Sequence, residues 1–310
     1  MLVSHRVAAQ PAAAVRRIGV LSSGAPDSPE WLRKEAEPLR ELGWVEGRNL
    51  LVDRRYDNGR PEALPALAQE LVRARVELIV VGSTSAARAA KQATASIPIV
   101  FSVGDPVLLG LVASLARPGG NLTGVSEAGP ELAEKFLSLI RELLPRIERI
   151  GVLSEAGNPY NLATRGQFAD ACKRLGMTPV FGEIGAAADT GRAIASLVQQ
   201  RAQAVVLFNS VRDYQAALVA AAAKHGLPTL TEDPQSVRES GALLGYDASR
   251  AELVRLRAEY IDRILRGAKP AELPVRQPTK FDLAINLRSA RELGIAVPKT
   301  LLVRADEVVQ

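Results

Sequence analysis

Residues 76–126, VELIVVGSTSAARAAKQATASIPIVFSVGDPVLLGLVASLARPGGNLTGVS, contain two consecutive strand–turn–helix units. The first strand is predicted at residues 78–81, a short apolar run rich in β-branched side chains, as in a buried parallel strand. It ends at GSTS (residues 82–85), whose hydroxyl groups suit the start of a helix over residues 86–95. The stretch therefore predicts an α/β fold with a parallel sheet.

The second unit follows the same plan. A strand is predicted at residues 98–101, and Asp105-Pro106 resembles a helix N-cap with proline at the first helical position, which predicts a helix through residue 115. Loops that follow parallel strands leave the same edge of the sheet, and open α/β sheets bind their ligands at this edge. We therefore expect a binding site where the two turns lie.

A second, similar sheet is predicted further along the chain. The segment RIGVL occurs at residues 17–21 and again at 149–153, followed each time by a polar turn. Further strands are expected at 50–55, near a sheet edge because it alternates, and at 178–182, 204–208, 228–230 and 241–246. Helical segments separate them. The sequence predicts two similar open parallel-sheet, Rossmann-like lobes in succession.

Composition excludes several classes of protein. The 310 residues carry a net charge of +5, but arginines are scattered along predicted helices with acidic residues nearby, which indicates solvated helix faces and no nucleic-acid partner. One cysteine and two histidines provide neither a disulfide nor a metal cluster, so no cofactor is expected. No apolar run approaches the length of about 20 residues that crosses a bilayer.

Motifs for catalysis and for nucleotide binding are missing from the sequence. GSTS (residues 82–85) is neither a Walker A loop nor a dinucleotide-binding G-x-G-x-x-G. Helix capping and the binding of a small anion explain it equally well. There is also no G-x-S-x-G, no H-E-x-x-H and no Cys–His pair. Nothing is arranged to make or break bonds, so we do not expect an enzyme.

The sequence resembles the type I periplasmic substrate-binding proteins of ABC importers, whose characterised relatives bind aromatic or other amino acids. The resemblance covers residues 16–310 and is most specific at residues 264–298, ILRGAKPAELPVRQPTKFDLAINLRSARELGIAVP. RRIGVLS (residues 16–22), FSVGDPVLLGLV (101–112) and RPGGNLTGVS (117–126) also agree. It implies a solute receptor whose two lobes close on a small polar ligand and deliver it to a membrane permease.

The resemblance also implies a three-crossover hinge, with crossings near residues 123–126, 244–247 and 274–279. The first lobe is expected at residues 16–124 plus about 247–276, and the second at 125–246 plus about 277–310. Residues 1–15 contain AAQPAAA, similar to the region around a signal cleavage site, and are interpreted as a residual leader. We expect a periplasmic monomer whose export signal is absent or trimmed.

The expected ligand contacts are short polar side chains that follow predicted strands of both lobes. They are Ser22, Ser23, Ser83, Thr84, Asp105, Asn158, Tyr160, Asn209, Glu232, Asp233 and Asp247. An anion site beside several carboxylates favours a zwitterion, such as an amino acid, over a sugar. The alternatives are an α/β enzyme acting on a small carboxylate and an effector-sensing domain without its DNA-binding head.

Overall fold

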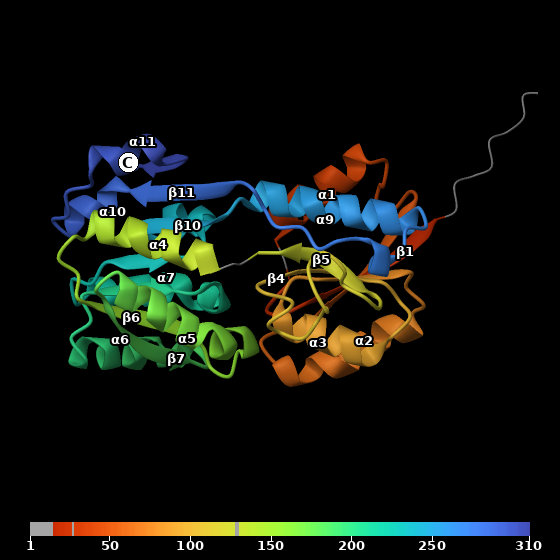
Figure 1. Ribbon diagram of the computed structural model, residues 1–310, viewed down its shortest axis with the longest axis horizontal. Helices are drawn as coiled ribbons and strands as arrows, with labels where there is room; N and C mark the ends of the chain where they lie inside the picture. The colour runs from red at the N-terminus through yellow and green to blue at the C-terminus, as the bar shows by residue number, and fades with distance from the viewer. Residues whose placement is uncertain (1–14, 27, 128–129) are drawn as a thin grey trace, which may run out of the picture.

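The computed structural model describes residues 15–26, 28–127 and 130–310, which form two α/β lobes side by side along the long axis (Figure 1). The first lobe contains a parallel five-stranded sheet in the order β2 (Leu50–Tyr56), β1 (Arg16–Ser22), β3 (Leu78–Val81), β4 (Ile99–Val103), β5 (Leu122–Ser126). Its helices are α1 (Pro29–Glu41), α2 (Leu64–Arg73), α3 (Thr84–Ala93) and α9 (Arg250–Leu265). The expected α/β class and the edge position of β2 are confirmed.

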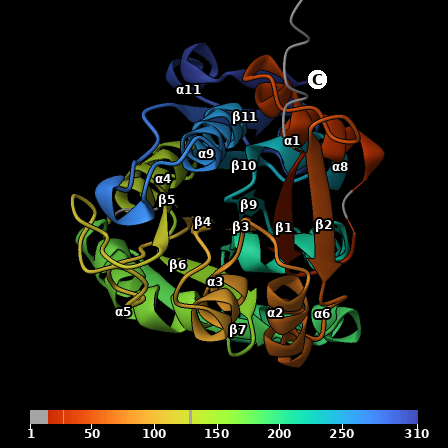
Figure 2. The same ribbon diagram turned by 90° about the vertical axis from the view of Figure 1, so that its right-hand side faces the viewer.

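The buried strand β3 shows why the sequence is continuously apolar there. Leu78 and Val80 pack into a core that α9 covers, whereas Ile79 and Val81 pack into a second core that α2 and α3 cover. Figure 2 shows these helix pairs, α1 with α9 and α2 with α3, on opposite faces of the sheet. Since successive side chains of a strand point to opposite faces, a sheet covered on both faces needs apolar residues at every position.

The second lobe contains a seven-stranded sheet, which is mixed because β11 runs antiparallel to β10. Its order is β12 (Glu307–Val309), β11 (Phe281–Asn286), β10 (Leu244–Ala248), β9 (Thr229–Thr231), β8 (Ala204–Leu207), β6 (Arg149–Glu155), β7 (Thr178–Ile184). Its helices are α4 (Pro130–Leu143), α5 (Pro159–Arg174), α6 (Thr190–Gln199), α7 (Gln215–Ala223), α8 (Val237–Ser240), α10 (Leu287–Glu292) and α11 (Lys299–Arg304). None of the described helices is long and apolar enough to span a membrane.

The chain passes between the lobes at the strand ends that face one another. Strand β5 ends at Ser126 in the first sheet, and α4 packs in the second lobe. Ser249 separates β10 of the second sheet from α9 of the first lobe. The chain then returns beside β5, where the Arg276 N–H donates to Gly124 O at 3.0 Å, before it enters β11. Except for Val15, the expected leader lies outside the described residues, as do positions 128 and 129.

The expected helix over residues 106–115 is wrong, because residues 104–118 form a series of turns. The Asp105 carboxylate accepts hydrogen bonds from the N–H groups of Val107 and Leu108 at 3.0 Å, as an N-cap would. Gly110, however, has a φ of +67°, a left-handed conformation that ends any helix. The apolar residues of the segment are buried all the same, and Leu109 and Leu111 pack into the core beside α3.

The returning segment is fixed to the start of α9 by Glu252. Its buried carboxylate accepts hydrogen bonds from Thr279 N at 2.8 Å, from Lys280 N at 2.7 Å and from the Thr279 hydroxyl at 2.8 Å. Burial opposes the charged form, but the hydrogen bonds from Lys280 and Thr279 outweigh it and lower the pKa of Glu252. Glu252 therefore joins the first lobe to the segment that leads into β11.

Replacing Glu252 by alanine is expected to lower the free energy of unfolding by about 2–3 kcal/mol, because two backbone donors and a hydroxyl lose a charged acceptor. Since the pKa of Glu252 is lowered in the fold, its contribution is present above the ordinary pKa of a glutamate and is lost as the pH falls below it. Denaturant unfolding at neutral pH measures the loss. The control is Glu272→Ala, whose exposed carboxylate lies 3.7 Å from Lys269; an equal loss in both variants would contradict the assignment.

Candidate functional site

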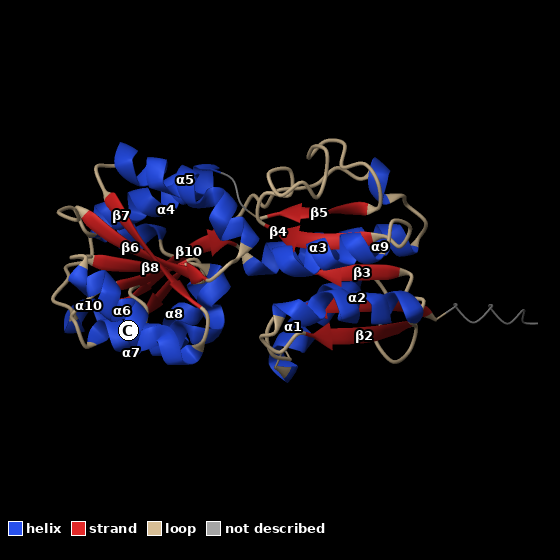
Figure 3. Ribbon diagram, turned by 90° about the horizontal axis from the view of Figure 1, so that it is seen from below, coloured by secondary structure: helices blue, strands red, loops and turns tan. Residues whose placement is uncertain are grey.

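The carboxyl ends of the first sheet's strands point toward the second lobe (Figure 3), and residues of the two lobes approach one another there. A methyl group added to Gly104, after β4, would lie 2.3 Å from Cε2 of Tyr160 in α5. One added to Gly24, after β1, would lie 2.9 Å from a carboxylate oxygen of Asp213, which follows β8. We call the region between these two contacts, bounded by the loops after the strands of both sheets, the interlobe site.

The first lobe contributes hydroxyl groups and the start of α3 to this site. The hydroxyls of Ser23 and Ser83 lie 2.8 Å apart. Ser83 is the N-cap of α3, and its Oγ accepts a hydrogen bond from Ala86 N at 3.2 Å. Thr84 begins the helix and is buried, while Ser22 is half-buried at the end of β1. The first N–H groups of a helix have no intrahelical partner and carry its positive end, so this edge attracts anions.

The second lobe contributes two carboxylates that Asn209 joins. The Asn209 backbone N–H donates to Glu232 at 3.1 Å, and its side-chain Nδ2 donates to Asp247 Oδ2 at 2.7 Å. Asn209 follows β8, Glu232 follows β9 and Asp247 lies in β10, so three adjacent strands position the group. The other side-chain atom of Asn209, the oxygen Oδ1, is buried and has no hydrogen-bond partner among the described residues.

Burial disfavours charge throughout this group. Glu232 keeps some exposed surface, but protein surrounds its carboxyl group, and this desolvation raises its pKa to about 7. Burial also raises the pKa of Asp247, and the neighbouring Glu232 raises it further. The pKa of the Tyr160 hydroxyl is raised by burial and then by Glu232 and Asp105, so it stays protonated and able to donate.

The remaining expected residues have local partners. Asn158 is the N-cap of α5 and accepts hydrogen bonds from Tyr160 N and Asn161 N, while its Nδ2 donates to Glu155 at 3.0 Å. Asp233 forms an ion pair with Arg212 at 3.2 Å, at the edge of the group rather than within it. The structure thus brings Tyr160, Asn209, Glu232 and Asp247 together.

Two carboxylates near this region were absent from the residues expected from the sequence. Asp57, after β2, is 1% exposed, and its Oδ1 accepts hydrogen bonds from Gly24 N at 2.8 Å and Gly59 N at 2.9 Å. Glu127, after β5, accepts a hydrogen bond from the Ser102 hydroxyl and contributes to the raised pKa of Asp247. Both residues directly follow a strand. The pattern that identified the expected ligand contacts, a polar side chain after a strand, therefore also applies to Asp57 and Glu127.

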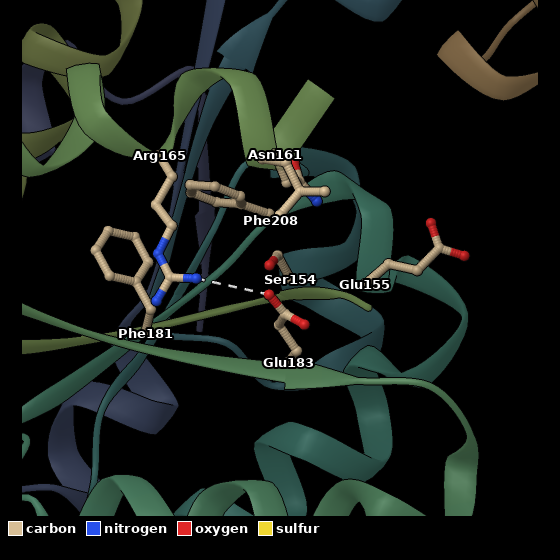
Figure 4. A pocket seen from close by; sticks show the side chains of 8 residues that line it. Ser154, Glu155, Asn161, Arg165, Phe181, Glu183 and Phe208 are labelled. Atoms are coloured by element: carbon tan, nitrogen blue, oxygen red, sulfur yellow. Dashed lines mark ion pairs between the residues drawn. The ribbon is translucent and has the colours of Figure 1, made fainter. Parts of the chain in front are cut away.

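A small pocket lies within the second lobe, apart from the two lobe contacts. It is lined by Ser154, Glu155, Asn161, Leu162, Arg165, Phe181, Glu183 and Phe208 (Figure 4). The Arg165 guanidinium lies 4.4 Å from the centre of the Phe181 ring and 3.6 Å from Glu183. All lining residues come from one lobe, so closure of the lobes is not needed to form this pocket. Within the described residues no cluster of His, Cys, Asp and Glu is suited to a metal ion.

The sequence profile of one family, described as "ABC transporter substrate binding protein", matches residues 34–309. The chain belongs to this family. The match includes both sheets from β2 onward, and with them most of the interlobe site. The expected type I periplasmic binding protein fold agrees with the two α/β lobes.

Individual proteins are also similar to this chain. A tyrosine-binding protein of Clostridioides difficile is 28% identical over 259 residues, 83% of this chain and 74% of the relative. A conserved domain protein from Vibrio cholerae is 27% identical, with a TM-score of 0.87 over 95% of this chain and 99% of that one. A Streptococcus pneumoniae protein in complex with L-Trp is 24% identical, also with a TM-score of 0.87, over 96% of this chain and 100% of that one.

Proposed function

We propose that this substrate-binding protein closes its lobes on an amino acid or a related small carboxylate. The observation that carries the proposal is the start of α3, where Ser83 caps the helix and meets the Ser23 hydroxyl at the lobe boundary. A ligand carboxylate placed there would receive charge-assisted hydrogen bonds from the first N–H groups of the helix. The relative named for tyrosine binding supports this class of ligand.

The same proposal includes the partners and the location of the protein. It would act as a monomer in the periplasm, bind no nucleic acid and pass its ligand to the membrane permease of an ABC importer. Membership of a family of substrate-binding proteins supports a receptor rather than an enzyme. The first lobe would comprise residues 16–124 with about 247–276, and the second 125–246 with about 277–310, so that the chain passages act as the hinge.

Calorimetric titration tests the carboxylate contact. The free amino acids are expected to bind, whereas their amides are expected to bind about tenfold more weakly or worse, because a neutral amide forms no charge-assisted bond with the helix start. Ser83→Ala combined with Thr84→Ala is expected to weaken binding by about 1–3 kcal/mol. Ser138→Ala on α4, where the hydroxyl donates only to Glu134 O within the helix, is the control. Amides that bind as well as the free acids would refute the assignment.

A further inference from the structure

The backbone of Tyr160 is fixed at the start of α5. The Asn158 side chain accepts hydrogen bonds from the N–H groups of Tyr160 and Asn161, at 3.1 Å and 3.3 Å. One turn further along the helix, the Thr164 hydroxyl donates to Tyr160 O at 2.9 Å. Because the helix holds the backbone, the ring can change its place within the lobe only by rotation about the side-chain bonds.

The ring of Tyr160 extends from the second lobe onto the first. It packs against the first-lobe core that α2 and α3 cover. It also meets Gly104, where an added methyl group would lie 2.3, 2.5 and 2.8 Å from the ring atoms Cε2, Cζ and Cδ2. A ring that fits beside position 104 only because glycine has no Cβ has little freedom to turn in this arrangement of the lobes.

The hydroxyl end of the ring lies near carboxylates of both lobes. Burial raises the pKa of the Tyr160 hydroxyl most, and Glu232 and Asp105 raise it further. Asp247 and Glu127 act on it in the same direction. Glu232 follows β9 of the second sheet, whereas Asp105 follows β4 of the first. Together with the contact at Gly104, these neighbours show that the ring occupies part of the interlobe site.

We propose that the ring of Tyr160 selects the ligand by size, so that the protein accepts an amino acid or related carboxylate with a small side chain and rejects an aromatic one. The helix α3, at whose start the proposed function places the ligand carboxylate, packs next to α5, which carries Tyr160. A ligand held there lies beside the ring, and its side chain must fit into the space that the ring leaves. This inference rests on the proposed function, because it assigns the side chain of the same ligand.

Steric rejection is effective at this position because the ring is held on both sides. The backbone of Gly104 blocks movement toward the loop after β4, and the cap of α5 fixes the other end of the side chain. An aromatic ligand therefore requires either that the ring rotates away from the first-lobe core or that the lobes stay further apart. Both changes lower the affinity, whereas a small side chain requires neither.

Calorimetric titration of the full chain with matched ligands tests the selection. The small ligands are glycine, alanine, serine, threonine, valine and lactate. The aromatic ligands are phenylalanine, tyrosine, tryptophan and 3-phenyllactate. The tightest ligand of the wild type is expected to be a small one, and each aromatic ligand is expected to bind at least about tenfold more weakly.

Two variants of Tyr160 separate the size of the ring from its hydroxyl group. Tyr160→Ala is expected to bind the aromatic ligands about tenfold or more tightly than the wild type does, and the small ligands up to about tenfold more weakly, because space is left unfilled. Tyr160→Phe keeps the ring and is expected to retain the preference for small ligands. The control is Leu162→Ala on the same helix, an exposed position that is expected to leave binding unchanged.

A gain of affinity for aromatic ligands cannot result from misfolding, so Tyr160→Ala remains informative even if its stability falls. If the wild type binds aromatic ligands as tightly as small ones, or if Tyr160→Ala gains nothing for them, the selection is overturned and the receptor function stands. Loss of the preference in Tyr160→Phe would assign it to the hydroxyl group and would also overturn selection by size.

Two further outcomes bear on the proposed function itself. If the amides of the amino acids bind as well as the free acids while the preference for small side chains holds, the carboxylate contact fails and the selection by Tyr160 stands. If none of the ligands binds to the wild type or to Tyr160→Ala, both proposals are overturned.

Discussion

Gly104→Ala is expected to weaken ligand binding by about 100-fold or more, because it prevents the lobes from closing. The added methyl group would lie 2.3 Å from Cε2 and 2.5 Å from Cζ of Tyr160, well inside van der Waals contact. Gly104 does not have a positive φ, so alanine suits its backbone and the first lobe should fold normally. Calorimetry measures the affinity, and small-angle scattering measures whether ligand still reduces the radius of gyration.

Two further variants show whether the ring of Tyr160 causes the effect. Gly82→Ala is the matched control, because Gly82 follows the adjacent strand β3 and a methyl group there would meet nothing within 4 Å. Tyr160→Ala added to Gly104→Ala should restore closure, since it removes the ring that the methyl group strikes. If Gly104→Ala alone binds and compacts like the wild type, the contact between Gly104 and Tyr160 does not control closure.

Glu232→Gln is expected to stabilise the empty protein at pH 8 by up to about 3 kcal/mol, the free energy that corresponds to a pKa raised from 4.5 to about 7. The fold prefers the neutral acid, so the wild type has its full stability below pH 4.5 and loses some of it as the pH rises through 7. Glutamine resembles the neutral acid at every pH. Denaturant unfolding of both proteins at pH 5 and pH 8 measures the difference.

The pH dependence of this difference is the decisive feature. The two proteins should have nearly equal stability at pH 5 and should diverge toward pH 8, whereas Glu292→Gln, on the exposed face of α10, should show no such divergence. A variant that is less stable than the wild type at pH 8 would mean that the Glu232 carboxylate is stabilised as an anion in the empty protein.

The sequence predicted the positions and the ends of several strands well, because parallel strands buried on both faces are short runs of apolar residues. The run at residues 78–81 and the repeated RIGVL segments are short and apolar and are followed by polar turns, and β3, β1 and β6 lie there. The polar residues after these strands were identified by the same rule. The structure brings together Asn209, Glu232 and Asp247 because β8, β9 and β10 are adjacent in the sheet. No local sequence pattern predicts this order of strands.

The errors arose where tertiary packing overrides the local pattern. Residues 106–115 have the composition of a helix, but Gly110 takes a left-handed conformation and the apolar side chains are buried by turns. The segment LLVRADEVV (residues 301–309) carries the end of α11 and then β12, which extends the second sheet beside β11. Asp57 follows β2, and its Oδ1 links two different loops by accepting hydrogen bonds from the N–H groups of Gly24 and Gly59.

The position of α9 in the chain has a consequence for the order in which the protein is synthesised. Ile18, Leu50, Leu78, Val100 and Val125, one from each strand of the first sheet, pack into the core that α9 covers. The ribosome finishes β5 at Ser126 but must then make residues 127–249 before α9 begins, an interval of about 6–25 s at about 5–20 residues per second. During this time one apolar face of the nascent first lobe lacks its cover and can bind chaperones or other unfolded chains.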